Sequence, residues 1–334
     1  MASVDVIVPC YQYGHFLREC AASVLTQDVS GLRLVIIDNA STDNTLEVAR
    51  ELAAADNRVE VIAHDRNLGH LASFNEGIDR ATATYFLILC ADDLLAPGAL
   101  VRAVSIMERH PEVVLTYGAA LVFGANEAIP ATASYSREAQ WRISSGREFL
   151  ERCCRTARGH IPGPTAVVRT AAQKQVGHYR AGLPHTSDLE VWLRLACLGA
   201  IAETDAVQGV IRGHAGNRCS SVSDIHHWDL DFEAAFDSFF AQEGRSLPDA
   251  DRLRRAVRRA LSERAYWGSV THLLRGNADL SFRLLRLALT RWPTSMFIPP
   301  FGYLFRRENA LGRIAQVLSE SVGRLNGGEG QNTP

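Results

Sequence analysis

The segment "YFLILCADDLLAPGAL", residues 85–100, places two adjacent carboxylates directly after a strongly apolar run. Residues 85–90 are aromatic or aliphatic apart from one cysteine, a composition typical of a buried strand. Asp92 and Asp93 follow, and then a turn and a proline lead into a predicted helix over 97–110. Because neighbouring like charges repel each other, this pair at the end of a buried strand is the first candidate for a functional site.

Outward from this segment, the first part of the chain alternates between strands and helices. This alternation is typical of a parallel sheet with helices on both faces. The sequence therefore predicts an α/β fold built on a single Rossmann-like, mostly parallel sheet flanked by helices. The strands are predicted at 4–9, 32–38, 59–63, 85–90 and 113–118, and the helices at 15–27, 44–55, 70–81 and 97–110.

The pattern is less regular after residue 118. It predicts a long loop over 124–146, strands at 165–169 and 206–214, a helix at 188–199, and helices at 225–243, 249–275, 278–291 and 309–325. We therefore expect an α/β domain over 1–223, a helical C-terminal extension over 224–326, and a disordered tail over 327–334.

Composition excludes several classes of protein. Hydrophobic residues make up 47% of the 334 residues, which is ordinary for a globular chain, and the net charge of −2 offers no attraction to nucleic acid. The seven cysteines show no C-x-x-C spacing, which favours buried free thiols in a reducing compartment and argues against zinc binding. No signal-peptide pattern and no run of about 18 apolar residues occur, so we expect a cytoplasmic protein, attached at most to the inner face of the cell membrane.

Polar side chains follow the predicted parallel strands. Ligands of open α/β sheets bind beyond the carboxyl ends of these strands, so residues there are binding-site candidates. The candidates at or after the ends of the first four strands are the apolar Pro9 and the polar Tyr11, Asp38, Asn67, Asp92 and Asp93.

The loop after the first strand argues against dinucleotide binding. It reads "PCYQYGHF", residues 9–16, with the single glycine Gly14, where a G-x-G-x-x-G turn would be needed to approach a pyrophosphate. Without a glycine-rich cradle, a diphosphate could instead be neutralised by Mg²⁺ or Mn²⁺ held on Asp92 and Asp93. The alternative is that these acids only cap the following helix or form an Asx turn.

Four segments together resemble a known family. They are "VIVPCYQYGHFLRECAASVLTQ" (6–27), "LVIIDNASTDNT" (34–45), "NLGHLASFNEGI" (67–78) and the segment at 85–100. In order and spacing they resemble the nucleotide-binding half of family 2 glycosyltransferases with a GT-A fold, and the resemblance covers about residues 3–220.

The resemblance assigns roles to the strand-end residues. It implies that Pro9, Tyr11 and Asp38 contact the nucleobase and ribose, that Asp93 holds the metal, and that Asp92 contacts the ribose or the phosphates. Asn67 is placed in the same nucleotide-sugar-binding set. Many members have a further aspartate in a D-x-D-D motif, where this chain has Cys90, which leaves the division of roles between Asp92 and Asp93 open.

The second half supplies a candidate base. "HTSDLEVWLRLA", residues 185–196, resembles the acidic motif of the family at a helix start, with Asp188 in the place of the aspartate and Ser187 in that of the usual glutamate. A carboxylate can take the proton of an acceptor hydroxyl as the new bond forms. Asp188 could also be a plain N-cap, and Glu190 is the reserve candidate for the base.

A histidine and two arginines follow a later strand. "VIRGHAGNRCSS", residues 210–221, resembles the R-x-H segment of the family, which implies that His214 reaches the metal or the diphosphate and that Arg212 and Arg218 lie near the leaving group. His160 and Thr165, in "HIPGPTAVVR" (160–169), are weaker candidates for the wall of the acceptor site.

The C-terminal helices are basic, with fourteen arginines against six acidic residues over 251–334. This charge suggests peripheral contact with an anionic membrane or a lipid-diphosphate acceptor. The favoured alternative is a helical subdomain that packs on the sheet or on another subunit and exposes its arginines.

The sequence and the resemblance together predict a metal-dependent, inverting glycosyltransferase. It would move a sugar from a nucleotide-diphosphate sugar, with UDP the expected carrier, to an acceptor hydroxyl on a saccharide or lipid-linked saccharide in cell-surface polysaccharide or glycolipid synthesis. The alternatives are a nucleotidyltransferase, which would release pyrophosphate, and an inactive nucleotide-sugar-binding module. A methyltransferase that uses S-adenosylmethionine is a third rival, but the first strand lacks its glycine-rich turn.

Overall fold

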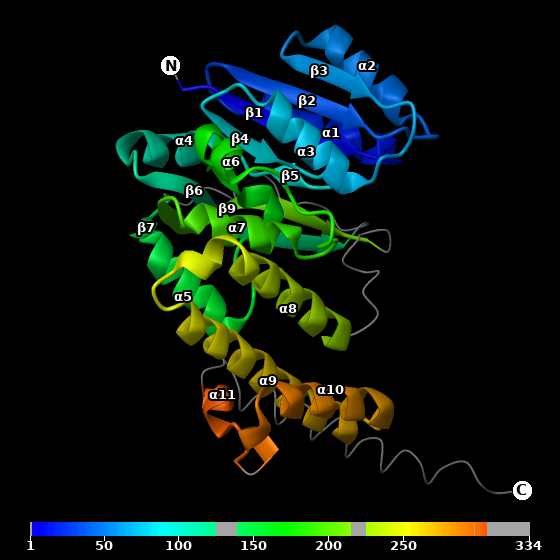
Figure 1. Ribbon diagram of the computed structural model, residues 1–334. Helices are drawn as coiled ribbons and strands as arrows, with labels where there is room; N and C mark the ends of the chain where they lie inside the picture. The colour runs from blue at the N-terminus through cyan, green and yellow to red at the C-terminus, as the bar shows by residue number, and fades with distance from the viewer. Residues whose placement is uncertain (1, 125–138, 215–224, 297, 306–334) are drawn as a thin grey trace, which may run out of the picture. The chain divides into compact units, whose positions relative to one another are not determined.

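The structure is a computed structural model that describes residues 2–124, 139–214, 225–296 and 298–305 (Figure 1). The chain divides into two compact units. One consists of Met1–Glu151 and Gly159–Ser221, and the other of Arg152–Arg158 and Val222–Pro334. The limits at 223 and 326 that the sequence suggested for the domains stay predictions.

The first unit begins with parallel strands in the order β3-β2-β1-β4. The predicted alternation of strands and helices is confirmed here, and two of the strands begin and end at the predicted residues. The strands are β1 (Val4–Cys10), β2 (Leu32–Asp38), β3 (Val59–Ala63) and β4 (Tyr85–Ile88), and the helices that follow the first three are α1 (Gly14–Leu25), α2 (Thr45–Ala55) and α3 (His70–Arg80).

The sheet continues from β4 through mixed pairings in the order β8-β6-β9-β5, and β7 also pairs with β9. The β6–β9 pair is parallel, while the other four pairings in this part are antiparallel. The result is one nine-stranded sheet within the described part of the chain, which confirms the α/β prediction. These strands are β5 (Leu94–Leu95), β6 (Val113–Gly124), β7 (Trp141–Ser144), β8 (Val167–Arg169) and β9 (Ala200–Gly213).

Several elements of this second half differ from expectation. Strands β6 and β9 are longer than predicted, because β6 continues past residue 118 and β9 begins at Ala200, before its predicted start at 206, and the two pair along these extensions. Strand β7 lies inside the predicted loop over 124–146, of which 125–138 fall outside the described residues. Four elements were not predicted: β5, β7, and the helices α5 (Gly146–Thr156) and α6 (Thr170–Val176). The patterns of β5, β7 and α6 are too brief to read locally, whereas α5 is as long as α2 and was missed. The helices α4 (Ala99–Arg109) and α7 (Ser187–Ala196) agree with prediction within two to three residues.

A continuous apolar core fixes the carboxyl ends of the strands. Residues of β1, β2 and β4 such as Val6, Leu34 and Leu87 are fully buried against Leu17 and Val24 of α1. Close packing of this kind holds the backbone still, so the loops after the strands start from fixed positions.

Gly14, the single glycine of the first loop, serves helix packing. A Cβ atom at this position would lie 2.2 Å from Asn44 Oδ1 and 2.9 Å from the backbone nitrogen of Thr45. Only glycine therefore lets the start of α1 approach the start of α2 this closely.

The second unit is helical. A small apolar core formed by Ala265 and residues of α10 joins two of its helices, and the buried Arg264 donates a hydrogen bond to Asp229. No helix of the described ranges combines the length and the apolar character needed to cross a membrane. The predicted helix at 309–325 and the tail at 327–334 lie outside the described residues. The helices are α8 (Ile225–Ala241), α9 (Ala250–Leu274), α10 (Ala278–Arg291) and the unpredicted short α11 (Phe301–Phe305).

Candidate active site

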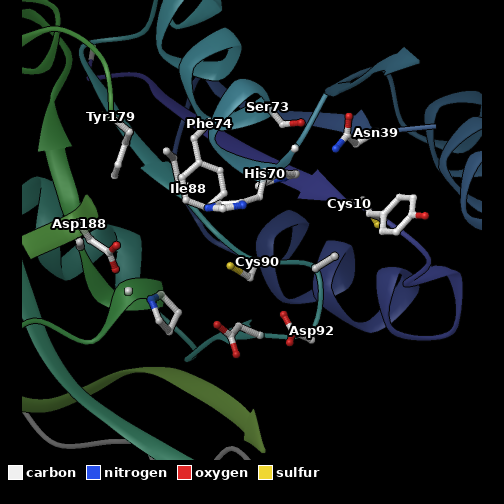
Figure 2. A pocket seen from close by; sticks show the side chains of 18 of the residues that line it. Cys10, Asn39, His70, Ser73, Phe74, Ile88, Cys90, Asp92, Tyr179 and Asp188 are labelled. Atoms are coloured by element: carbon white, nitrogen blue, oxygen red, sulfur yellow. The ribbon is translucent and has the colours of Figure 1, made fainter. Parts of the chain in front are cut away.

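A pocket of about 610 Å³ opens at the carboxyl ends of β1 and β4 (Figure 2). Its wall combines the loops after these strands, the start of α3 and the start of α7. The structure therefore brings residues from both halves of the first unit together at one pocket. Six of the predicted site residues line it: Pro9, Tyr11, Asn67, Asp92, Asp93 and Asp188.

Asp92 and Asp93 lie in the turn between β4 and β5. The turn is closed by a hydrogen bond from the backbone nitrogen of Asp93 to the carbonyl of Cys90 (3.0 Å), and the two acids are only 7% and 8% exposed. Burial, followed by the negative charge of Asp92, raises the pKa of Asp93 to about 8, although the backbone N–H and the charge of Arg212 oppose this rise. Ionising both carboxylates is thus unfavourable unless a cation joins them.

The end of β9 contacts both acids. The backbone nitrogen of Arg212 donates to Asp93 Oδ1 (3.3 Å), and its Nη2 forms an ion pair with Glu19 (2.6 Å). His214 Nε2 lies 3.0 Å from Asp92 Oδ2. His214 therefore contacts Asp92, the neighbour in sequence of Asp93, which is the predicted metal ligand. The role of His214 as a metal ligand stays a prediction.

The donor atoms in this turn fit a divalent cation. One ligand atom each from Cys90, Asp92 and Asp93 lies within 4.8 Å of the others. Two carboxylates suit Mg²⁺ or Mn²⁺. The raised pKa of Asp93 indicates that a positive charge nearby would stabilise its ionised form. Cys90 lies where the aspartate of the D-x-D-D motif would be, and its thiol adds a softer donor.

The end of β2 is organised differently from expectation. Asp38 is buried and does not line the pocket, and its carboxylate accepts hydrogen bonds of 3.3 and 3.4 Å from the backbone nitrogen of Ser41. The next residue, Asn39, lines the pocket and donates to Asn67 Oδ1 (2.9 Å), while its own Oδ1 accepts from the backbone nitrogen of Leu68 (2.9 Å). Asn39 thus ties together the loops after β2 and β3, and the contact of Asp38 with the nucleotide stays a prediction.

Asp188 lies in the first turn of α7, half-buried in the pocket wall. The helix begins at Ser187 and its N-cap is Thr186, so Asp188 is not the cap itself. Figure 2 shows its carboxylate directed toward the pocket, on a different element from the one that carries Cys90 and Asp92. The N-terminal end of a helix favours the ionised form of a carboxylate, which suits a base.

Glu190, the reserve candidate, faces away from this pocket. It is fully buried, is absent from the pocket lining, and pairs with both Arg180 and Arg194. Thr165 is also buried, and its hydroxyl donates to the carbonyl of Pro162 (2.8 Å). His160 is not among the lining residues, and Arg218 lies outside the described residues.

The sequence did not single out an aromatic wall of the pocket. Phe74 of α3, Tyr179 and Trp192 of α7 all line it, and the rings of Phe74 and Tyr179 lie 5.4 Å apart edge to face. Asn75 fixes this wall, because its side chain accepts from the backbone nitrogen of Tyr179 (2.7 Å) and donates to its carbonyl (3.0 Å). The sequence signals for it are the inclusion of Phe74 and Asn75 in the quoted segment at 67–78 and of Trp192 in the quoted segment at 185–196.

Two solved structures share the fold. TarS from S. aureus, in complex with UDP-GlcNAc, aligns with a TM-score of 0.60 at 19% identity, over 95% of this chain and 81% of its own. The mannosyltransferase PcManGT from Pyrobaculum calidifontis, in complex with GDP-Man and Mn²⁺, aligns with a TM-score of 0.54 at 16% identity, over 96% and 84%. At these identities the likeness establishes the GT-A fold alone.

Sequence comparison identifies the family. An uncharacterized glycosyltransferase of Haemophilus influenzae is 24% identical over 224 residues, which are 66% of this chain and 68% of that protein. Two other curated glycosyltransferases match the chain over less than half of their own length. Residues 5–176, more than half of the chain, match the family described as Glycosyl transferase family 2. The resemblance seen in the motifs is therefore confirmed, and the chain belongs to glycosyltransferase family 2.

Proposed function

We propose that the protein is an inverting, divalent-metal-dependent glycosyltransferase that uses a nucleoside-diphosphate sugar. The observation that carries the proposal is the shared pocket of the buried pair Asp92–Asp93 and the half-buried Asp188. The pair provides a place for a cation and a diphosphate, and Asp188 provides a base on another wall. The complexes of TarS with UDP-GlcNAc and of PcManGT with GDP-Man and Mn²⁺ support this kind of donor, and UDP is the carrier we expect.

In the proposed reaction Asp188 accepts the proton of the acceptor hydroxyl. The hydroxyl oxygen forms a bond to the anomeric carbon while the bond from that carbon to the diphosphate oxygen breaks, and the diphosphate leaves with the electron pair. Attack from the face opposite the leaving group inverts the anomeric carbon. When bound, a cation on Asp93 would supply Lewis-acid stabilisation of the charge on the diphosphate.

The acceptor is proposed to be a saccharide or a lipid-linked saccharide. The rings of Phe74, Tyr179 and Trp192 give the pocket a wall suited to the apolar face of a sugar ring. We place the reaction in cell-surface polysaccharide or glycolipid synthesis, in the cytoplasm. The exposed arginines of α9, among them Arg255 and Arg258, would allow peripheral contact with the inner face of the membrane.

A thermal-shift panel tests the donor site. The full chain is mixed with UDP, dTDP, GDP, CDP, NAD or S-adenosylmethionine, each with and without Mn²⁺. A ligand at 100 times its Kd stabilises the folded protein by about 2.7 kcal/mol, which raises the midpoint by several degrees. We expect one nucleoside diphosphate to do so only with Mn²⁺.

Two variants sharpen this test. Asp93→Ala should abolish the Mn²⁺-dependent shift, whereas Asp28→Ala, which removes an exposed acid outside the pocket, should keep it. A shift with NAD or S-adenosylmethionine alone would contradict the proposal. No shift with any nucleotide would favour the inactive module, and pyrophosphate release in a turnover assay would favour a nucleotidyltransferase.

A further inference from the structure

Cys90 places a thiol in the wall of the pocket beside the two acids. The residue is exposed and lines the pocket, and Figure 2 shows its sulfur in the same part of the wall as Asp92. Cys197 is the other exposed cysteine of the described residues, and it lies outside this pocket. Cys90 is therefore set apart by its neighbours rather than by its exposure.

The turn after β4 explains why three donors converge. The hydrogen bond from the backbone nitrogen of Asp93 to the carbonyl of Cys90 folds the four-residue segment back on itself. The sulfur of Cys90 and one oxygen each of Asp92 and Asp93 consequently lie within 4.8 Å of one another. In a tetrahedral Zn²⁺ site, with about 2.3 Å to sulfur and 2.0–2.2 Å to oxygen, neighbouring donor atoms lie roughly 3.4–3.6 Å apart. Small side-chain rotations would bring all three donors onto one ion.

We propose that Cys90 is a sulfur ligand of the cation held by Asp92 and Asp93, and that the site therefore favours softer divalent ions such as Zn²⁺ and Co²⁺ over Mg²⁺. The inference rests on the proposed metal-dependent function. Thiolate ligands prefer such ions, whereas Mg²⁺ prefers oxygen alone. The absence of C-x-x-C spacing argues only against a site made of several thiolates. His214, 3.0 Å from Asp92, is placed to orient that carboxylate.

Cobalt provides a readout that does not depend on turnover. The full chain is titrated with Co²⁺ alone and with Co²⁺ plus UDP or GDP, while uptake is measured by equilibrium dialysis. A bond between sulfur and Co²⁺ gives a charge-transfer absorption in the near ultraviolet. We expect this absorption in wild type and in Cys197→Ser, and its complete loss in Cys90→Ser at the same amount of bound Co²⁺.

Competition between metals gives a second measurement. Cys90→Ser should weaken Zn²⁺ binding by about tenfold or more and change Mg²⁺ binding little. Cys90→Asp should shift the preference toward Mg²⁺ and Mn²⁺.

Three results would overturn the proposal: bound Co²⁺ without the absorption in wild type, an absorption that survives in Cys90→Ser, or no Co²⁺ uptake with or without nucleotide. The nucleotide shifts described above separate these failures. If a nucleoside diphosphate still stabilises the protein only with Mn²⁺, the ligand assignment alone fails. If that shift is also missing, the metal-dependent function fails as well.

Discussion

Glu190 and Arg194 form an ion pair one turn apart on α7, with 2.9 Å between Oε2 and Nη2 and at most 2% of either side chain exposed. Arg180 also pairs with Glu190, and Arg194 donates to the carbonyl of His178 (2.8 Å). Both ion pairs of Glu190 thus belong to a buried network that fixes the start of α7. Asp188, two residues earlier, is left to line the pocket.

Replacement of Asp188 by asparagine should slow sugar transfer without changing the binding of the nucleotide. Asp188→Asn keeps the shape of the side chain but cannot accept the proton, so we expect turnover to fall by about 10²–10⁴-fold. The Mn²⁺-dependent shift with the nucleoside diphosphate should be unchanged. The measurement is the initial rate of sugar transfer at saturating donor and acceptor, beside the thermal shift.

Glu190→Gln is the matched control on the same helix. Loss of the Glu190 carboxylate leaves the buried Arg194 and the half-buried Arg180 without this charge partner, which should lower the free energy of unfolding by about 3–5 kcal/mol. Below its lowered melting temperature the folded variant should still turn over within a few-fold of wild type. A drop in turnover for Glu190→Gln with normal turnover for Asp188→Asn would contradict both assignments.

His214 offers a test of the cation site. Because His214 meets Asp92 at 3.0 Å, His214→Gln should weaken Mn²⁺ binding in the presence of UDP or GDP by about 10–100-fold. Isothermal titration of Mn²⁺ into the protein–nucleotide mixture measures this change. His110→Gln, at an exposed histidine paired with Glu112 outside the pocket, is the control and should bind Mn²⁺ as wild type does. If both variants bound Mn²⁺ with the same Kd, His214 would not contribute to the cation site.

The parallel half of the fold could be predicted because its signals are local. The strands 32–38 and 59–63 are mostly apolar segments bounded by loop residues, and the structure has them as β2 and β3 with the same limits. The carboxyl ends of parallel strands share one edge, so the sequence alone predicts that Asp92 and Pro9 lie at one site, and both line the pocket.

Other features depend on contacts between distant residues. The two-residue β5 exists only through its pairing with β9, and no local pattern distinguishes so short a strand. Asn39 is held in the pocket wall by a hydrogen bond to Asn67, 28 residues away in the sequence. Tyr179 is held there by a hydrogen bond to Asn75, 104 residues away. Asp38 differs from these residues. The sequence predicts it as a nucleotide contact because it ends a strand, but its buried carboxylate accepts a hydrogen bond from the backbone nitrogen of Ser41.

The buried pair Arg264–Asp229 should dominate the stability of the helical unit. Burial raises the pKa of Asp229, and the charge and the hydrogen bond of Arg264 oppose that rise. Arg264→Met would leave a buried acid unpaired and cost about 3–5 kcal/mol, whereas Arg264→Met combined with Asp229→Leu should recover more than half of the loss. Hydrogen exchange of peptides from α8 and α9 reports the change.

The exposed Arg258 of the same helix provides the control for this pair. Arg258→Met should change protection of these peptides by no more than about 0.5 kcal/mol. If the double variant were as unstable as the sum of the two single variants, the two residues would not act as a pair.

Asp5 should give the first unit a pH-dependent stability of known sign. Burial alone would raise the pKa of Asp5, but hydrogen bonds from Arg33 (2.8 and 2.9 Å) and from the backbone nitrogens of Ala83 (3.0 Å) and Thr82 (2.7 Å) lower it below its usual range. A carboxyl whose pKa is lower in the folded state stabilises the protein above the unfolded pKa of about 3.9, and this contribution is lost as the pH falls through the folded pKa.

Asp5→Asn should therefore lower the free energy of unfolding by about 2–4 kcal/mol at pH 7, and the difference from wild type should shrink as the pH is lowered below about 4. Urea unfolding of both proteins between pH 7 and pH 3.5 measures it, with exposed Asp28→Asn as the control that should stay close to wild type throughout. A difference that stays constant or grows toward low pH would show that Asp5 acts through packing, because an amide and a protonated carboxyl have nearly the same size and neither carries the charge that Arg33 binds.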